Sequence, residues 1–185
     1  MEMLKVIMVR SDLENIPQHP LPAGYSLRFY RDGDAATWTA IEQAADKFYN
    51  VTGERFVKEF GTEIPLLFQR CYFLVSPDGR DIGTTTAWYD RKYQGKRWGR
   101  VHWVAVVPEF QGKGLGKAML SSAMNRLRML GHRRAILGTQ TPRLAAINMY
   151  LDFGFVPDMT TDNAAKAWKI VREALPHPKL KKLLL

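Results

Sequence analysis

Residues 104–117 impose the strongest constraint on how this chain can fold. They run from a β-branched stretch through a proline and three closely spaced glycines to the start of a lysine-containing helix. Glycines at 112, 114 and 116 let successive backbone N–H groups turn toward one point without a Cβ clash. A helix beginning near Leu115 adds unpaired first-turn donors and the positive end of its dipole. The stretch therefore predicts a strand–loop–helix unit that binds a phosphate or pyrophosphate.

The spacing of the glycines excludes two common phosphate loops. A Walker loop needs Ser or Thr after its Gly-Lys pair, but Ala118 follows Gly116 and Lys117. In the dinucleotide fingerprint Gly-x-Gly-x-x-Gly, Lys117 would occupy the third glycine position, and residues 132–134 are basic where an acidic ribose partner is expected. What remains is the pattern Gln-x-x-Gly-x-Gly, formed by Gln111, Gly114 and Gly116.

A second motif follows downstream. Apolar periodicity predicts a helix that begins near Leu115 and ends at Gly131, a strand over residues 134–140, and another helix over residues 144–153. This last helix carries Tyr150 four residues before Gly154 and Phe155. The two motifs, in this order and with one strand between them, resemble those of the GNAT superfamily of N-acetyltransferases. The resemblance covers about residues 25–157.

The resemblance implies an α/β fold with a splayed central mixed β-sheet flanked by helices. It also implies acetyl-CoA as cosubstrate, no metal, and transfer of the acetyl group to a primary amine by direct attack in a ternary complex. The pantetheine arm of CoA would extend along the strand edge at Ala105, Val106 and Val107. The pyrophosphate would be held by the loop formed by Gln111, Gly112, Lys113, Gly114, Leu115, Gly116 and Lys117.

The family's catalytic chemistry can be carried over to single residues. Tyr150 is the candidate general acid, since a phenol is protonated at neutral pH and can donate to the departing thiolate. Glu109 is a candidate base, with Asp90, Glu42, Asp46 and a water relay left open. His102 is interpreted as a sheet histidine whose ring is satisfied by the fold.

Two residues of the second helix are further candidates for cofactor binding. The position seven before the tyrosine is often an Asn that bonds the pantetheine arm, but here it is Arg143. Arg143 is expected either to reach a CoA phosphate or to be a solvated helix-start residue. Asn148 lies two positions before Tyr150, on a different face of the helix.

The upstream sequence predicts the remaining elements. A strand is expected over residues 25–30 and a helix over residues 52–60. Between them a further helix is expected, capped by Asp32 or Asp34, with an apolar face formed by Trp38, Ile41, Ala45 and Phe48. Antiparallel strands are expected over residues 70–76, 82–88 and 100–107, with a hairpin turn at residues 76–79. Residues 1–24 are expected to form an N-terminal extension packed on one domain. That domain spans residues 25–185 and ends in a helix over 164–175 and a basic tail.

Composition narrows the setting. The 185 residues suit one domain, and the single cysteine, Cys71, excludes an internal disulfide and is expected to be a buried apolar residue. No segment is long and apolar enough for a membrane span or a signal peptide, so a cytoplasmic protein with no membrane partner is expected.

The net charge of +9 raises nucleic-acid binding as an alternative. The basic residues are dispersed, however, and a polyanionic cosubstrate accounts for part of the excess. A non-catalytic acyl-CoA-binding module and an enzyme for succinyl or longer acyl groups also remain open. The acceptor is expected to be a small-molecule or peptide amine, and a homodimer is left open.

Overall fold

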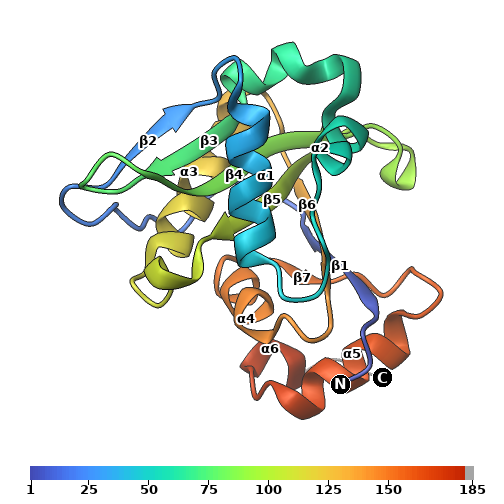
Figure 1. The fold of residues 1–185 in the computed structure, drawn as a ribbon. Helices are drawn as coiled ribbons and strands as arrows, with labels where there is room; N and C mark the ends of the chain where they lie inside the picture. Colours follow the sequence, from blue (N-terminus) through green and yellow to red (C-terminus); the bar gives the residue numbers. More distant parts are fainter. Residues whose placement is uncertain (182–185) are drawn as a thin grey trace.

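The computed structural model describes residues 1–181, which form a seven-stranded mixed sheet flanked by helices (Figure 1). The strand order is β2-β3-β4-β5-β6-β1-β7. The strands are β1 (Lys5–Arg10), β2 (Ser26–Phe29), β3 (Cys71–Val75), β4 (Asp81–Asp90), β5 (Trp98–Val106), β6 (Ala135–Gln140) and β7 (Val156–Pro157). The basic tail that the sequence predicts extends into residues 182–185, which lie outside the described residues.

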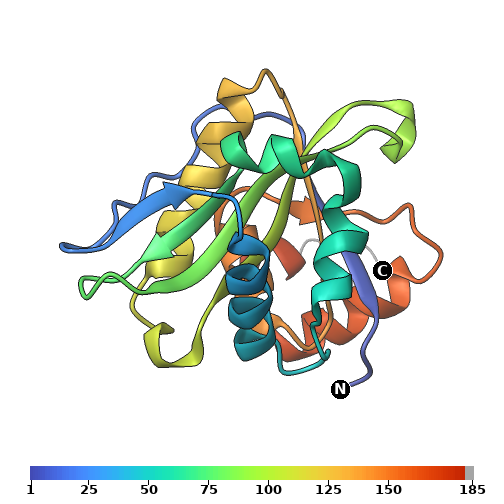
Figure 2. The same ribbon diagram turned by 45° about the horizontal axis from the view of Figure 1, so that its top comes forward.

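Helices cover both faces of the sheet (Figures 1 and 2). The α-helices are α1 (Asp34–Ala45), α2 (Gly53–Phe60), α3 (Leu115–Met129), α4 (Leu144–Asp152), α5 (Ala164–Ala174) and α6 (Pro178–Lys181). Three short 3₁₀ segments are η1 (Gly61–Gln69), η2 (Tyr93–Gly95) and η3 (Pro108–Phe110). The predicted order of elements is thus confirmed from β2 to α5, with boundaries shifted by a few residues.

Each face of the sheet has its own apolar core. On one face, Trp38 and Ile41 of α1 and Phe56 and Phe60 of α2 pack against β3 and β4. On the other face, α3, α4 and α5 pack against β1 and β6, with Trp168 of α5 fully buried. Burial of these apolar side chains provides the main stabilisation of the sheet between its two helical layers.

The two central parallel strands, β5 and β6, pair only at their beginnings. Gly99 and Arg100 lie opposite Ala135 and Ile136, and no pairing continues beyond them. The strands then diverge, so one edge of β5 is left open toward β6. This is the splayed sheet that the resemblance predicts.

The N-terminal segment differs from its expected role. Lys5–Arg10 form a strand that pairs antiparallel with β6 on one side and with β7 on the other. Val6 and Met8 are buried in the core beneath α4 and α5. Residues 5–10 are therefore an interior strand of the sheet and not an extension that packs on it, because alternate side chains of this apolar run fill the core.

The start and end of α1 also correct the sequence interpretation. The residue at the N-cap is Gly33, with φ of 88°, and neither predicted aspartate caps the helix through its side chain. Asp34 is instead held by Arg28, at 2.6 Å. Phe48 lies beyond the end of the helix and is 42% exposed, because α1 stops at Ala45.

Other features follow the sequence closely. Gly131 ends α3 with φ of 80°, as a C-terminal glycine does. Cys71 is fully buried, and burial raises the pKa of its thiol to about 11. Among the described residues no helix is both long and apolar enough to cross a bilayer.

Candidate active site

The loop after β5 has the backbone that an oxyanion site requires. Gly112 and Gly114 have φ of 78° and 77°, and α3 begins at Leu115 directly after them. A Cβ placed on either glycine would meet nothing within 4 Å. Glycine is therefore needed here for its dihedral angle and not for lack of space, and the volume above the loop is open to a ligand. In the first turn of α3 the Lys117 amide already donates to Gly114 O, at 3.1 Å, so the amides of Leu115 and Gly116 are the ones that the helix start leaves for a ligand.

Gly116 and Leu115 contribute to this loop in a different way. Gly116 has no positive φ, and a Cβ there would lie 3.5 Å from Met149 Sδ of α4. Its role in the fold is therefore the close packing of α3 on α4. The side chain of Leu115 is buried in the core beside Met119, so only its backbone can serve a ligand.

The polar side chains of the loop already have protein partners. Lys113 Nζ lies 4.8 Å from the ring centroid of Phe110. Lys117 Nζ lies 3.7 Å from a carboxylate oxygen of Asp152. Gln111 donates from Nε2 to the carbonyl oxygen of Val106, at 2.7 Å, and so ties the loop to the end of β5.

Of the three strand residues predicted to line the pantetheine arm, only one has its backbone groups toward the open edge. The Val107 amide donates to Ile82 O of β4, at 2.9 Å, and Ala105 pairs with Thr84 in the same alternation. The intervening Val106 therefore directs its N–H toward the gap beside β6. The pantetheine contact at Ala105, Val106 and Val107 stays a prediction, and in this geometry Val106 is the residue with backbone groups free of β4 to make it.

A β-bulge in β5 shapes the gap. The pairing of β4 with β5 shifts register between Thr84 and Thr86, and Trp103, opposite the shift, has φ of 50°. A positive φ at a tryptophan is strained, so the surrounding packing must hold it. The Trp103 ring makes an edge contact with Trp38, with ring centroids 5.1 Å apart, and the Arg55 guanidinium lies 5.3 Å from it.

A cavity of about 560 Å³ opens where β5 and β6 diverge. Its walls come from residues 100–104 of β5 and 138–140 of β6, with Lys5 of β1 beside them. The ends of α1 and α2 and the segment between them close one side, and α4 closes another. Most of the titratable groups discussed below line this cavity: Lys5, Glu42, Asp46, Arg55, Glu59, Arg100, His102, Arg143 and Tyr150.

Tyr150, the predicted general acid, lies in the wall of the cavity. It lines the cavity from α4 and is 8% exposed. Its hydroxyl makes no hydrogen bond with a described residue. Burial raises the pKa of the phenol to about 12, so it keeps its proton at neutral pH. The alternative of a core tyrosine with a satisfied hydroxyl does not describe this geometry.

In the same cavity, the buried His102 pairs with the half-buried Glu59. His102 Nε2 lies 2.9 Å from Glu59 Oε2. Burial, aided by the nearby charges of Arg100 and Arg55, lowers the pKa of His102 to about 4. Burial opposes ionisation of Glu59, but the hydrogen bond from His102 and the other nearby donors and charges, Arg55 among them, together outweigh it and hold the pKa of Glu59 at about 2. At neutral pH a neutral imidazole therefore donates its Nε2–H to a carboxylate.

Glu42 and Arg143 meet at the end of α1. Glu42 is 4% exposed and its Oε1 has no hydrogen-bond partner. Burial and repulsion from Asp46 raise the pKa of Glu42 well above its usual value. Arg143 donates to Asp46 Oδ2 at 2.6 Å and also to the side chain of Gln140. The structure therefore places Arg143 in an ion pair across the cavity rather than at the glycine loop, so contact with a CoA phosphate remains only a prediction.

Three other predicted groups lie outside the cavity lining. Glu109 is exposed on η3, and Asp90 is at the far end of β4. Asn148 is half-buried on α4. No sequence motif indicated a role for Glu59, Arg100 or Lys5, because only the packing of α2, β5 and β1 brings them together.

Comparison with known proteins identifies the family. The model of the acetyltransferase (GNAT) family matches residues 35–155. The chain belongs to this family. GNAT enzymes use acetyl-CoA as the acetyl donor and acetylate amine acceptors, and the fold and loop described above agree with membership.

The similar proteins are distant. Mycothiol acetyltransferase from Streptomyces griseus subsp. griseus is 30% identical over 138 residues, which cover 73% of this chain and 44% of that protein. The protein of that name from Streptomyces coelicolor is 30% identical over 150 residues, covering 79% and 47%. This chain thus spans about half the length of the curated relatives it matches.

Solved structures share the fold. A GCN5-related N-acetyltransferase from Sphaerobacter thermophilus superposes with a TM-score of 0.67 at 21% identity, covering 83% of this chain and 48% of that one. The ribosomal-protein-S18-alanine N-acetyltransferase from Escherichia coli gives 0.57 at 21% identity, covering 71% and 77%.

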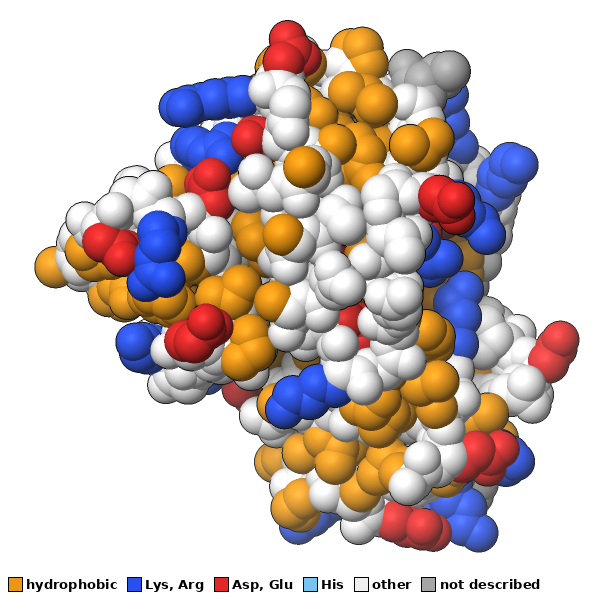
Figure 3. All heavy atoms as spheres, in the orientation of Figure 1, with side chains coloured by type: hydrophobic (Ala, Val, Ile, Leu, Met, Phe, Trp, Pro, Cys, Tyr) orange, Lys and Arg blue, Asp and Glu red, His pale blue; other side chains and the backbone are white. Residues whose placement is uncertain are grey.

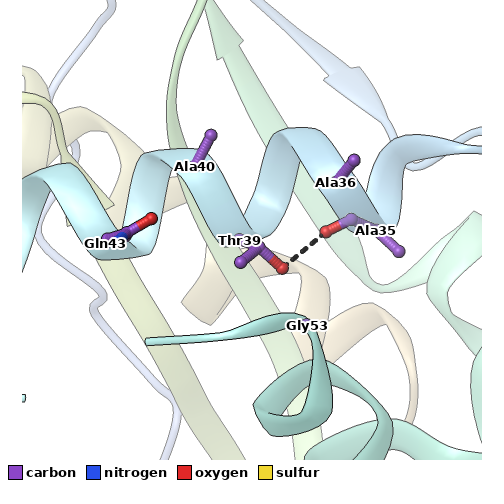
Figure 4. A pocket seen from close by; sticks show the side chains of 6 residues that line it. All are labelled: Ala35, Ala36, Thr39, Ala40, Gln43 and Gly53. Carbon is purple, nitrogen blue, oxygen red and sulfur yellow. Dashed lines mark hydrogen bonds between the residues drawn. The ribbon is translucent and has the colours of Figure 1, made fainter. Parts of the chain in front are cut away.

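Two surface features add no second site. A hollow on the outer side of α1 is lined by small or uncharged residues, namely Ala35, Ala36, Thr39, Ala40, Gln43 and Gly53, and Thr39 bonds its own helix (Figure 4). On the face seen in Figure 3, several lysine and arginine side chains lie near one another along the right-hand edge, and the others are scattered.

Proposed function

We propose that this chain transfers an acetyl group from acetyl-CoA to a primary amine by direct attack in a ternary complex. The observation that carries the proposal is the position of Tyr150, whose unpaired hydroxyl lines the cavity beside the open edge of β5. The glycine loop lies at the end of the same strand. Donor and acceptor would therefore meet between the loop and the beginning of the splay.

The donor side is proposed from backbone groups. The amides of the glycine loop and of the first turn of α3 would bind the pyrophosphate, with the positive helix end favouring its charge. The Val106 N–H would bond the amide arm. Lys113 and Lys117 would add charge at the rim of the loop, each worth little while exposed.

The transfer itself needs one proton donor and one proton acceptor. The amine nitrogen attacks the thioester carbonyl carbon, a C–N bond forms, and the C–S bond breaks. Tyr150 gives its proton to the departing thiolate, which accounts for a protonated phenol in the cavity. The amine attacks in its neutral form, and His102 takes the proton that the nitrogen releases once the C–N bond has formed, when that nitrogen has become a strong acid. Its Nε2–H is committed to Glu59, which leaves the lone pair of Nδ1 as the acceptor.

A CoA-release assay with a panel of amines tests this function. The panel covers amino acids, polyamines, aminoglycosides and peptide N-termini, together with the acceptor of the mycothiol acetyltransferases. Tyr150→Phe is expected to lower turnover by about 100-fold or more, the usual size of a general-acid contribution, and to leave CoA affinity unchanged in calorimetry. Tyr72→Phe is the control, since Tyr72 stacks on Phe29 of β2, away from the cavity.

The outcomes separate the alternatives. CoA binding without release in the presence of any amine would indicate a binding module. Equal turnover of Tyr150→Phe and the parent would reduce Tyr150 to a packing residue. Faster release from succinyl-CoA or longer acyl-CoA would change the acyl class. Salt-dependent binding to a generic duplex, with no binding of CoA, would favour a nucleic-acid-binding protein.

A further inference from the structure

Four basic side chains line the cavity, and two of them have no acidic partner. Arg55 pairs with Glu59 at 3.1 Å, and Arg143 pairs with Asp46 at 2.6 Å. Arg100 and Lys5 make no ion pair or side-chain hydrogen bond within residues 1–181. The positive charge of the cavity is thus left uncompensated at these two positions.

Arg100 and Lys5 lie on the same face of the sheet. Arg100 is directly opposite Ile136 in the parallel pair, so both side chains project to one side. Gly138 follows two residues later on that side, and its missing Cβ would lie 3.7 Å from Lys5 Cε. The two cations therefore lie on either side of one stretch of β6, where Gly138 has no side chain to fill the space between them.

Arg100 and Lys5 lie at the end of the cavity where the acceptor would bind. Arg100 stands where β5 and β6 begin to diverge, whereas the glycine loop follows the other end of β5. About 20 Å of extended strand separates Arg100 from Val106. A donor held by the loop would reach the middle of β5 first, which leaves the stretch beside Arg100 to the acceptor.

The nearby titratable groups do not neutralise the two cations. Burial raises the pKa of Glu42 well above its usual value, so this carboxyl favours its neutral form. Burial and the charge of Arg100 lower the pKa of His102, which stays neutral as well. A ligand bearing only an ammonium group would meet net repulsion, whereas an oxyanion would pair with both cations.

We propose that the acceptor is an amine that also carries an oxyanion, a carboxylate or a phosphate, and that Arg100 and Lys5 bind this group. The proposal rests on the proposed function and specifies its substrate class. Binding of the oxyanion would anchor the acceptor at the beginning of the splay and direct its amine toward His102 and Tyr150. The contacts are charge-assisted, and an arginine can bind either anion through two parallel N–H groups.

Matched pairs of acceptors test the proposal. L-leucine is compared with L-leucinamide, O-phosphoethanolamine with ethanolamine, and D-glucosamine 6-phosphate with D-glucosamine, using kcat/KM for CoA release. In the parent, the anionic member of at least one pair is expected to be better by about tenfold or more, since one charge-assisted contact corresponds to such a factor. The pair that responds distinguishes a carboxylate from a phosphate.

Two variants assign the effect to the cations. Arg100→Gln and Lys5→Gln should each lower kcat/KM for the preferred anionic acceptor by about tenfold and change that of its neutral partner by less than about twofold. Arg133→Gln is the matched control, because Arg133 is exposed and outside the cavity lining. Lys5 is exposed on β1, so its variant is expected to fold even if Arg100→Gln does not. Thermal unfolding and CoA affinity are measured for every variant.

Each other result has a definite meaning. Neutral and anionic acceptors used equally well by the parent would overturn the proposal and leave the proposed function standing. Arg100→Gln that weakens CoA itself, with no change between matched acceptors, would assign Arg100 to the donor and also overturn the proposal. Failure to acetylate any amine would overturn the proposed function and this inference with it.

Discussion

At the scale of single residues, the buried carboxyl of Glu42 makes stability depend on pH in an unusual direction. Its pKa is raised in the folded chain above the value of 4.5 in the unfolded chain. The folded state therefore binds the proton more tightly, and the free energy of unfolding falls as pH rises from about 5 toward the folded pKa. Glu42→Gln lacks this titration, so its Tm relative to the parent should increase between pH 5 and pH 8. Thermal unfolding at several pH values measures this difference. Glu109→Gln, at an exposed position on η3, controls for the change in net charge. A constant difference between Glu42→Gln and the parent across this range would show that Glu42 is already ionised in the fold.

At the scale of elements, the glycine loop contains one glycine that is needed for its positive φ, Gly114, and one that is needed for helix packing, Gly116. Gly114→Val forces a β-branched residue to φ of 77°, so it should distort the start of α3 and weaken CoA binding by about tenfold or more. Gly116→Ala is the matched control, since Gly116 has no positive φ and its new Cβ would lie 3.5 Å from Met149 Sδ. We expect CoA affinity within about threefold of the parent for this control. Calorimetry measures both affinities, and equal losses in the two variants would mean that the packing of α3 on α4 matters as much as the dihedral angles of the loop.

At the scale of the whole molecule, the N-terminal strand should matter as much as any core element. Met8 is fully buried between α5 and the sheet, whereas Met3 is 44% exposed. Met8→Ala is expected to lower the free energy of unfolding by about 2–5 kcal/mol, and Met3→Ala to change it by less than about 0.5 kcal/mol. Urea unfolding measures both values. A small loss for Met8→Ala would restore the interpretation of residues 1–24 as a peripheral extension.

The sequence by itself determined the features that depend on local backbone and on periodicity. The glycines at 112 and 114, the helix that ends at Gly131 and the placement of Tyr150 on α4 follow from residues close together in the chain. The parallel pairing of β5 with β6 was predictable too, because α3 connects these two strands directly in the chain. Short apolar strands such as Lys5–Arg10 gave no indication of their neighbours in the sheet, since an alternating pattern fixes a face and not a partner.

Only the tertiary structure decided what fills the cavity. Lys5, Glu42, Arg100 and Tyr150 come from four elements and meet where β5 leaves β6. The diverging part of β5 contains the bulge at Trp103, whose ring contacts Trp38 of α1. Whether a charge is paired, as in Arg143, or left without a partner, as in Arg100, depends on residues distant in the sequence. The motifs could therefore predict the proposed donor loop and the proposed acid, but the proposed proton acceptor and the groups that would face the acceptor are set by long-range packing.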